Sequence, residues 1–352
     1  MRKHQKHANL SRAKNYLEIG LLGTSCDEIQ QWVNAFAEQS SLKIAYLDGS
    51  HDDSAPFPQK DSFTYNDLGF VELIRKGSRD QYQQAIDFRS YDLVFVNSNH
   101  FEAEKQIVFL NPKKQASVRR RADQLTQVLA CISLNEDWVV YDDLSTNIIR
   151  SQKEFNSFIS TQIQIPELKG LVMLGGKSSR MGRDKGQIIY HKKEQRFHMI
   201  ELVESLGIEA HVSVAKAQYN SMSNRIEDSF LDLGPMGGIL SAFKCFPSNA
   251  LLVLANDLPK VNRKLLMQLI KERDSSKVAT ALVAKDEKFP EPLICIYEPK
   301  AYARLLEFLS LGYSCPRKML INSEVKLIEV DPKYVENANS PEDFKRIKDG
   351  LL

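Results

Sequence analysis

The sequence lacks the cysteine spacing by which many zinc and redox proteins are recognised. Its five cysteines are odd in number, lie far apart and form no CxxC pair, which argues against a zinc site or a redox dithiol. Scattered cysteines of this kind are typical of inert thiols in a reducing cytoplasm. They are Cys26, Cys131, Cys245, Cys295 and Cys315.

Long apolar runs and a strong net charge are also missing. No apolar stretch approaches the roughly 20 residues needed to span a bilayer, and the basic N-terminus, MRKHQKHANLSRAK, lacks the apolar core of a secretory signal. A formal net charge of +2 gives no argument for nucleic acid or membrane binding. We therefore expect a cytoplasmic protein with no nucleic acid or membrane partner, and a flexible basic arm over residues 1–15.

The 352 residues suggest two domains. Both halves alternate apolar runs with helix-like segments, the pattern of parallel α/β folds, so two three-layer α/β domains are expected over residues 16–165 and 166–352. The predicted strands are residues 16–23, 42–48, 91–97, 105–111 and 137–143 in the first half and 169–174, 210–215, 250–257, 278–284 and 292–297 in the second. Residues 27–39 and 262–274 are predicted helices.

A glycine pair at mid-chain predicts a phosphate-binding loop. The apolar run KGLVML leads into Gly175 and Gly176, and Arg180 and Lys185 follow. Glycine lets the backbone approach a ligand closely, and the two cations supply positive charge for a triphosphate.

Further polar residues follow this loop in order. Asp228 precedes a second glycine turn, GPMGG, which ends at Gly238. Asp257 ends an apolar strand, where ligands of open α/β sheets bind, and a carboxylate there suits Mg²⁺. Asn337 and Asn339 precede a helix start in ENANSPEDF.

Together these motifs resemble the molybdenum cofactor guanylyltransferases of the MobA type. The loop LGGKSSRMGRDK is similar to that family's LAGGxSxRMGxDK, GPMGG to its GPLAG, and NANSPEDF to its NxNTPEDL. The resemblance covers about residues 169–352 and implies a Rossmann-like nucleotide-diphospho-sugar transferase fold for the second domain.

The resemblance implies transfer of GMP from GTP to molybdopterin that carries molybdenum, with release of pyrophosphate. It implies Mg²⁺ on Asp257, neutralisation of the leaving phosphates by Lys185 and Arg180, and a guanine or ribose contact from Asp228. Arg180, Lys185 and Asp257 are the implied catalytic residues. The implied nucleotide- and cofactor-binding residues are Met173, Leu174, Gly175, Gly176, Lys185, Asp228, Gly238, Asn337 and Asn339, with backbone N–H groups of residues 174–176 holding the nucleotide.

Two alternatives stay open. The first is transfer of another base, such as a cytidylyl group, or transfer to another acceptor. The Gly-Gly pair favours guanylyl transfer, but Ala215 or Lys216 stands where some family members place an asparagine. The second alternative is a scaffold or cofactor carrier without catalysis.

The first half has the strand, glycine turn and helix of a P-loop domain without its signature. Gly20 and Gly23 stand in the turn, but no Gly-Lys-Ser/Thr follows, and Cys26 and Asp27 occupy about those positions. An aspartate there would repel a triphosphate.

Residues 16–160 nevertheless resemble the molybdopterin-guanine dinucleotide adaptor proteins of the MobB type. Asn97 and Ser98 replace that family's Glu-Gly pair, so the resemblance implies a degenerate P-loop domain. Such a domain could dock the cofactor, another protomer, or a partner such as a molybdoenzyme or its chaperone.

Each of two polar segments in the first half can be interpreted either as solvent-exposed structure or as a binding site. His51, Asp52 and Asp53 form either a solvated loop or a remnant site. The basic run VRRRAD, residues 118–123, is predicted to be a solvated helix start, with an anionic-cofactor surface as the alternative.

Overall fold

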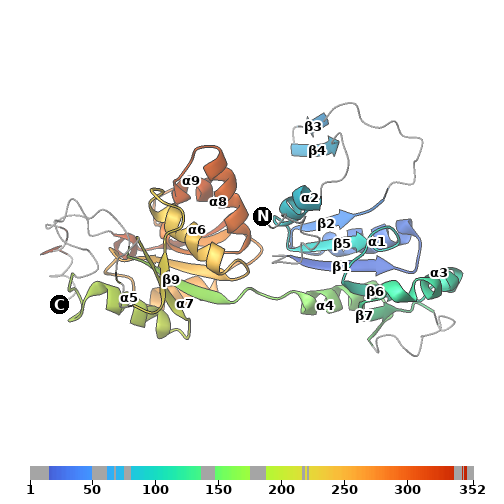
Figure 1. Cartoon of the computed structure of the whole chain (residues 1–352). Helices are drawn as coiled ribbons and strands as arrows, with labels where there is room; N and C mark the ends of the chain where they lie inside the picture. Colours follow the sequence, from blue (N-terminus) through green and yellow to red (C-terminus); the bar gives the residue numbers. More distant parts are fainter. Residues whose placement is uncertain are drawn as a thin grey trace, which may run out of the picture. The chain divides into compact units, whose positions relative to one another are not determined.

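The computed structural model describes residues 16–49, 62–66, 69–74, 81–135, 147–174, 188–215, 219, 222–336, 343, 345 and 346 (Figure 1). The chain divides into two compact units, Met1–Ile163 and Gln164–Leu352. The predicted boundary, between residues 165 and 166, lies two residues further along the chain. The basic arm over residues 1–15, the segment His51 to Asp53, and the strand predicted over residues 137–143 lie outside the described residues.

The first unit is built on a parallel sheet in the order β2-β5-β1-β6-β7-β8. Its strands are β1 (Leu17–Leu22), β2 (Ile44–Leu47), β5 (Leu93–Asn97), β6 (Lys105–Phe109), β7 (Gln127–Ile132) and β8 (Ile148–Ile149). A separate hairpin joins β3 (Ser62–Asn66) to β4 (Gly69–Ile74). Four of the strands were predicted, whereas β7, β8 and the hairpin were not.

Helices cover both faces of this sheet. Helices α1 (Cys26–Ala37) and α4 (Gln152–Gln162) pack on one face, where Trp32 and Phe155 meet edge to face. Helices α2 (Gln81–Phe88) and α3 (Gln115–Arg120) belong to separate clusters built around Val96 and Val108.

The basic run at residues 118–123 is not a helix start, so that prediction is wrong. Val118 is buried within α3, and the helix ends at Arg120. The Arg121 guanidinium then donates to the carbonyl of Asn99 at 3.3 Å. The run therefore closes a helix and fastens it to the loop after β5.

The second unit contains a seven-stranded sheet in the order β11-β10-β9-β12-β14-β13-β15. The strands are β9 (Leu168–Met173), β10 (Ala210–Val214), β11 (Arg225–Glu227), β12 (Ala250–Ala255), β13 (Ala279–Ala284), β14 (Glu291–Tyr297) and β15 (Val325–Val330). The five predicted strands are present, and β11 and β15 were missed. The sheet is not wholly parallel, because β14 runs antiparallel to both β12 and β13.

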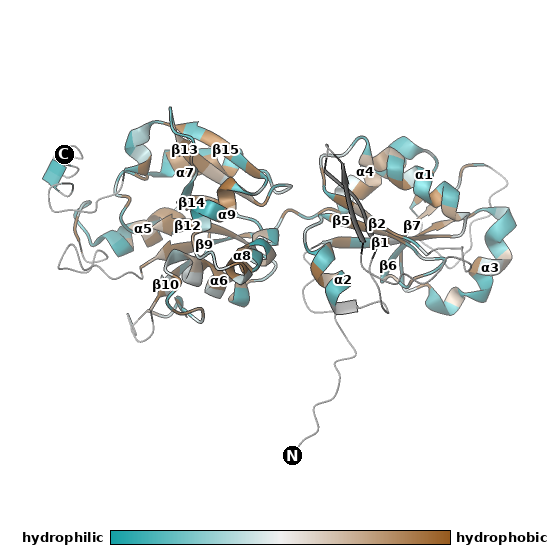
Figure 2. Ribbon diagram, turned by 90° about the horizontal axis from the view of Figure 1, so that it is seen from above, coloured by the Kyte–Doolittle hydropathy of each residue, from teal (hydrophilic) through white to brown (hydrophobic). Residues whose placement is uncertain are grey.

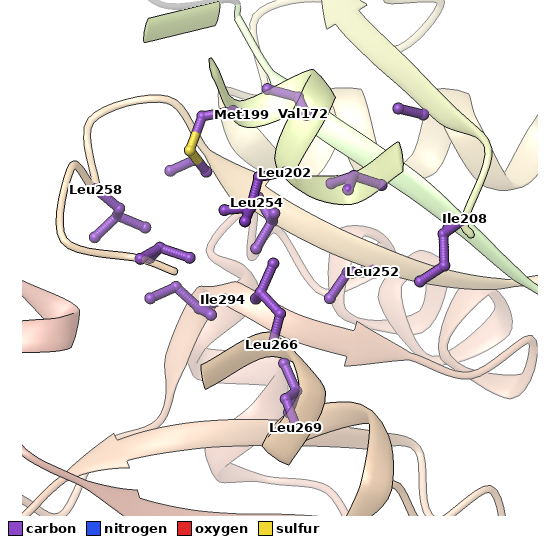
Figure 3. Close-up of a cluster of buried hydrophobic side chains, with 14 of the residues drawn as sticks. Val172, Met199, Leu202, Ile208, Leu252, Leu254, Leu258, Leu266, Leu269 and Ile294 are labelled. Carbon is purple, nitrogen blue, oxygen red and sulfur yellow. The ribbon is translucent and has the colours of Figure 1, made fainter. Parts of the chain in front are cut away.

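Alternate residues of these strands build two cores. Val172, Leu252 and Leu254 face α5 (Gln195–Glu204) and α7 (Arg263–Lys271), as Figure 3 shows. Leu171 and Val253 face α6 (Pro235–Cys245), α8 (Lys300–Ser310) and α9 (Pro316–Ile321). Figure 2 shows the inner strands in the hydrophobic colour, with hydrophilic residues on the helices. The predicted fold class, two α/β domains, is confirmed. Among the described residues, no helix has both the length and the apolar character needed to cross a bilayer.

Candidate functional site

The candidate site lies at the carboxyl edge of the second sheet. The parallel strands β9, β10, β11 and β12 all end there, and Met173 is in register with Ala255. Asp228 directly follows β11, and Asp257 follows β12 by two residues. Two of the predicted site carboxylates therefore lie on the same edge as the start of the glycine loop, the side on which open α/β sheets bind ligands.

Asp257 lies in a loop with buried flanks. Asn256 is buried on one side, and Leu258, fully buried in the core of Figure 3, follows on the other. His191 Nε2 lies 2.8 Å from the carbonyl oxygen of Pro259, which ties the chain after the glycine loop to this turn. The core packing of Leu258 thus holds the half-buried Asp257 at a fixed place on the edge.

The charge of Asp257 is felt by two neighbouring groups. Burial, then Asp257 and Asp343, raise the pKa of the Tyr190 phenol to about 12. Burial also raises the pKa of Glu291, and Asp257 adds to that shift while Arg317 opposes it. A divalent cation would relieve this concentration of negative charge, and carboxylate oxygen is the ligand type that Mg²⁺ prefers. The residues present therefore fit Mg²⁺.

Asp228 is held by backbone and side-chain contacts. Its N–H donates to the carbonyl of Val214 at 3.0 Å, and its Oδ1 accepts a hydrogen bond from the Ser213 hydroxyl at 3.0 Å. Burial raises the pKa of Asp228, whereas the bond from Ser213 lowers it. The hydroxyl therefore helps to keep a partly desolvated carboxylate ionised.

Gly238, in the first turn of α6, brings that helix close to this carboxylate. A Cβ at Gly238 would lie 2.3 Å from Ser213 Oγ and 2.5 Å from Met173 Cε. Only glycine lets the helix approach both β9 and β10 at this point. The structure thus gives Gly238 a packing reason that is independent of any ligand.

The N–H of Leu174, predicted to hold the nucleotide, is already engaged within the sheet. It donates to the carbonyl of Ser213 at 3.0 Å, which extends the sheet and leaves that group unavailable to a nucleotide. The side chains of Met173 and Leu174 are buried in the two cores.

The remaining predicted residues lie outside the described part of the chain. These are Gly175, Gly176, Arg180, Lys185, Asn337 and Asn339. Their flanks, however, are placed. Glu336, next to Asn337, pairs with Lys260 at 2.7 Å and also with Arg346, and Arg346 donates to Asp343 at 3.0 Å.

A pocket of about 700 Å³ adjoins this edge. It is lined by the end of β13, the start of β14, the start of α9, and η4 (Pro332–Val335). Three cations and three carboxylates line it: Lys285, Arg317, Lys333, Glu287, Glu291 and Glu336. Sequence reasoning missed the pocket and Tyr190, because none of these residues belongs to a recognisable motif.

The turn at the end of β1 in the first unit is tightly packed. Three residues, 23–25, connect β1 to α1, and Ser25 caps the helix by accepting from the N–H of Glu28. Gly23 has φ +92°, and a Cβ there would lie 2.3 Å from the carbonyl oxygen of Phe109. Asp27 and Glu28 occupy the first turn, where carboxylates would repel phosphate. The loss of the phosphate cradle stays a prediction, which the acidic first turn of α1 supports.

Comparisons with known proteins agree with this geometry. The family of MobA-like NTP transferase domains matches residues 170–325. A probable molybdenum cofactor guanylyltransferase of Opitutus terrae is 30% identical over 195 residues, which cover 51% of this chain and 94% of that protein. The chain belongs to the molybdenum cofactor guanylyltransferase family. Membership places it among the nucleotidyltransferases of molybdenum cofactor biosynthesis.

Other relatives differ in how much of them is matched. A molybdenum cofactor biosynthesis bifunctional protein of Synechocystis is 32% identical over 185 residues, which cover 51% of this chain and only 53% of that protein. The match to this relative thus spans about half of its length. Among solved structures, the molybdopterin-guanine dinucleotide biosynthesis protein A of Archaeoglobus fulgidus has a TM-score of 0.45 at 23% identity, covering 51% of this chain and 97% of its own. Bacillus subtilis MobB has a TM-score of 0.33 at 14% identity, covering 42% and 99%.

Proposed function

We propose that this chain transfers GMP from GTP to molybdopterin that carries molybdenum, forming the guanine dinucleotide form of the cofactor. The observation that carries the proposal is the placement of Asp228 and Asp257 at the edge where β9 enters the glycine loop, in a member of this family. That placement brings a candidate guanosine contact and a candidate metal ligand to one site.

The reaction is a displacement at the α-phosphorus of GTP. A terminal phosphate oxygen of molybdopterin forms the new bond as the bond to the bridging oxygen breaks, and the electron pair leaves with pyrophosphate. No general base is needed, because a phosphate is already anionic at neutral pH. Catalysis then consists mainly of positioning and charge neutralisation.

Each residue has a part in that positioning. Asp257 would hold Mg²⁺, which when bound supplies charge stabilisation for the phosphoryl group. Asp228 accepts hydrogen bonds from the guanine or the ribose, and its bond from Ser213 keeps it ionised for that purpose. Lys185 and Arg180 stabilise the leaving β- and γ-phosphates.

We place the acceptor in the pocket beside Glu291. Its volume of about 700 Å³ suits a small organic molecule. Arg317 pairs with Glu291 and Lys333 with Asp331, so we assign the contact with an anionic group of the acceptor to the exposed Lys285. Transfer of the product to a molybdoenzyme or its chaperone belongs to the same proposal. Because GTP is available there and thiols persist in a reducing compartment, we place the reaction in the cytoplasm.

Product analysis tests the proposal. Full-length protein, Mg²⁺ and molybdopterin are incubated with GTP or CTP, and pyrophosphate and the dinucleotide are quantified. We expect pyrophosphate and product in equal amounts with GTP, and loss of both when Mg²⁺ is chelated. Product with CTP alone would establish cytidylyl transfer, and no pyrophosphate with either nucleotide would favour a scaffold.

A further inference from the structure

Three side chains with metal-ligating atoms meet in the first unit. Cys26 is the first residue of α1, Asp48 directly follows β2, and His100 comes three residues after β5. The strands β2, β5 and β1 are parallel neighbours in the sheet. The three side chains therefore converge at its carboxyl edge, although they are distant in the sequence.

The distances suit a single ion. His100 Nε2 lies 3.3 Å from Cys26 Sγ and 3.8 Å from Asp48 Oδ1, and one ligand atom from each residue lies within 4.8 Å of the others. A tetrahedral ion with bonds of about 2.0–2.3 Å holds adjacent ligand atoms about 3.3–3.7 Å apart. Small side-chain rotations would complete such a geometry.

The same nitrogen of His100 faces both partners, which distinguishes this cluster from a nucleophile triad. In a triad, the nucleophile contacts one ring nitrogen and the carboxylate contacts the other. Here Nε2 is close to both Cys26 and Asp48. Convergence of three donor atoms on one point is the arrangement that a metal ion requires.

Neighbouring groups fix Asp48 in place. Its Oδ1 accepts from the N–H of Gly49 at 2.7 Å and from Asn97 Nδ2 at 2.8 Å, and its Oδ2 accepts from the Tyr46 hydroxyl at 2.9 Å. Supporting hydrogen bonds of this kind are typical of metal-ligating carboxylates.

Gly49 lets the histidine ring approach. A Cβ at Gly49 would lie 2.9 Å from His100 Cγ and 3.2 Å from Nδ1, so the imidazole packs directly against the backbone beside Asp48. A larger residue would push the ring away from the other two ligands. Gly49 is thus a positioning residue for the cluster.

We propose that Cys26, Asp48 and His100 bind one divalent transition-metal ion of the Zn²⁺ class. Thiolate, imidazole and carboxylate are the ligands of zinc, whereas Mg²⁺ takes oxygen ligands. Three protein ligands leave a fourth position for water or another donor, as in zinc sites that bind substrates. The site occupies the carboxyl edge of β1, beside the turn between β1 and α1.

The test uses the full chain, stripped with a chelator, and two metals. Zn²⁺ is titrated in competition with a chromophoric chelator, and Co²⁺ serves as the spectroscopic probe. We expect one competing site per chain and a thiolate-to-cobalt charge-transfer band in the near ultraviolet. A hundredfold excess of Mg²⁺ should displace neither ion. These measurements do not depend on guanylyl transfer, so the two proposals can fail separately.

Three variants and one control decide the outcome. Cys26→Ser should abolish the band and weaken Zn²⁺ binding by more than about 100-fold, and His100→Gln should weaken it similarly. Gly49→Ala should cost about tenfold through displacement of the ring. The control Cys245→Ser removes an exposed cysteine of the other unit and should change nothing. Wild-type affinity and band in Cys26→Ser, or no Zn²⁺ binding by the wild type, would overturn the proposal; circular dichroism checks that each variant is folded.

Discussion

Asp257 combines a fixed backbone with a charge that neighbouring groups feel. Asp257→Asn keeps the shape of the side chain and removes that charge. We expect kcat/KM for GTP to fall roughly 100- to 1,000-fold, the scale of a lost preorganised charge contact. Steady-state pyrophosphate release measures this. The matched control is Asp123→Asn, an exposed change in the first unit, and a near-normal rate for Asp257→Asn would refute the metal assignment.

Burial raises the pKa of Asp228, and the hydrogen bond from Ser213 opposes that shift. Ser213→Ala should therefore raise the pKa of Asp228 further. If ionised Asp228 binds the nucleotide, activity falls as pH drops through that pKa, and the acidic limb of the kcat/KM profile for GTP moves to higher pH in the variant. On that limb we expect kcat/KM to fall up to roughly tenfold below the wild-type value, the effect of one lost hydrogen bond, and the two profiles to converge at higher pH. Ser205→Ala, which removes a helix-end hydroxyl, is the control. Superimposable profiles would exclude this role.

Lys285 tests the acceptor pocket separately from the nucleotide site. It is exposed and lines the pocket beside Glu291. Lys285→Ala should raise KM for molybdopterin roughly 3- to 10-fold, as expected for one lost charge contact, and leave KM for GTP unchanged. Equal effects on the KM values of both substrates, or no effect on either, would refute the assignment of the acceptor to this pocket. Lys264→Ala on the exposed side of α7 serves as the control.

At the scale of elements, a buried ion pair joins the end of α7 to the end of β14. Arg273 binds Glu298 through two bonds of 2.6 and 2.7 Å, and a further bond of 2.9 Å reaches the carbonyl of Pro166. The Glu298 side chain is fully buried. The pair thus connects a helix, a strand and the chain that enters β9.

Breaking that pair should destabilise the second unit. Arg273→Ala leaves a buried carboxylate without its partner, which costs about 3–5 kcal/mol in free energy of unfolding. Urea denaturation measures the loss. Lys277→Ala breaks an exposed pair with Glu324 and should cost no more than about 1 kcal/mol. Equal losses in the two variants would show that burial does not determine how much each ion pair contributes to the free energy of unfolding.

The elements also show where sequence reasoning succeeds. Apolar runs such as ALLVLA predicted β12 because both faces of that strand are buried. The strand β15, with the sequence VKLIEV, was not predicted, because half of its residues are exposed at the edge of the sheet. The antiparallel direction of β14 could not be predicted either, because an apolar pattern predicts a buried strand but does not indicate whether it runs parallel or antiparallel to its neighbours.

At the scale of the whole molecule, the two units have separate cores, and one relative aligns over nearly all its length with half of this chain. We expect residues 164–352 alone to fold and to retain most of the guanylyl transfer of the full chain. Calorimetry with GTP and Mg²⁺ should detect binding to this fragment and none to residues 1–163. GTP binding by residues 1–163 would contradict our interpretation of the first unit.

Only the site residues that belong to a recognisable sequence motif could be predicted. Asp228 and Asp257 were found because each follows a recognisable strand or precedes a glycine turn. Tyr190 and the Glu336 pairs were missed, since their positions depend on how distant segments fold. The expectation of inert cysteines rested on spacing along the chain. Spacing cannot reveal Cys26 beside His100, 74 positions away.

The turn between β1 and α1 has the length of a phosphate cradle but not its side chains. Counted from Gly20, the residues Ser25, Cys26 and Asp27 fall at the Gly, Lys and Ser/Thr positions of GxxxxGK[ST]. A lysine at position 26 would supply the phosphate contact but would remove the thiol from the cluster with Asp48 and His100. One position at this edge can therefore serve an anion or a cation, but not both.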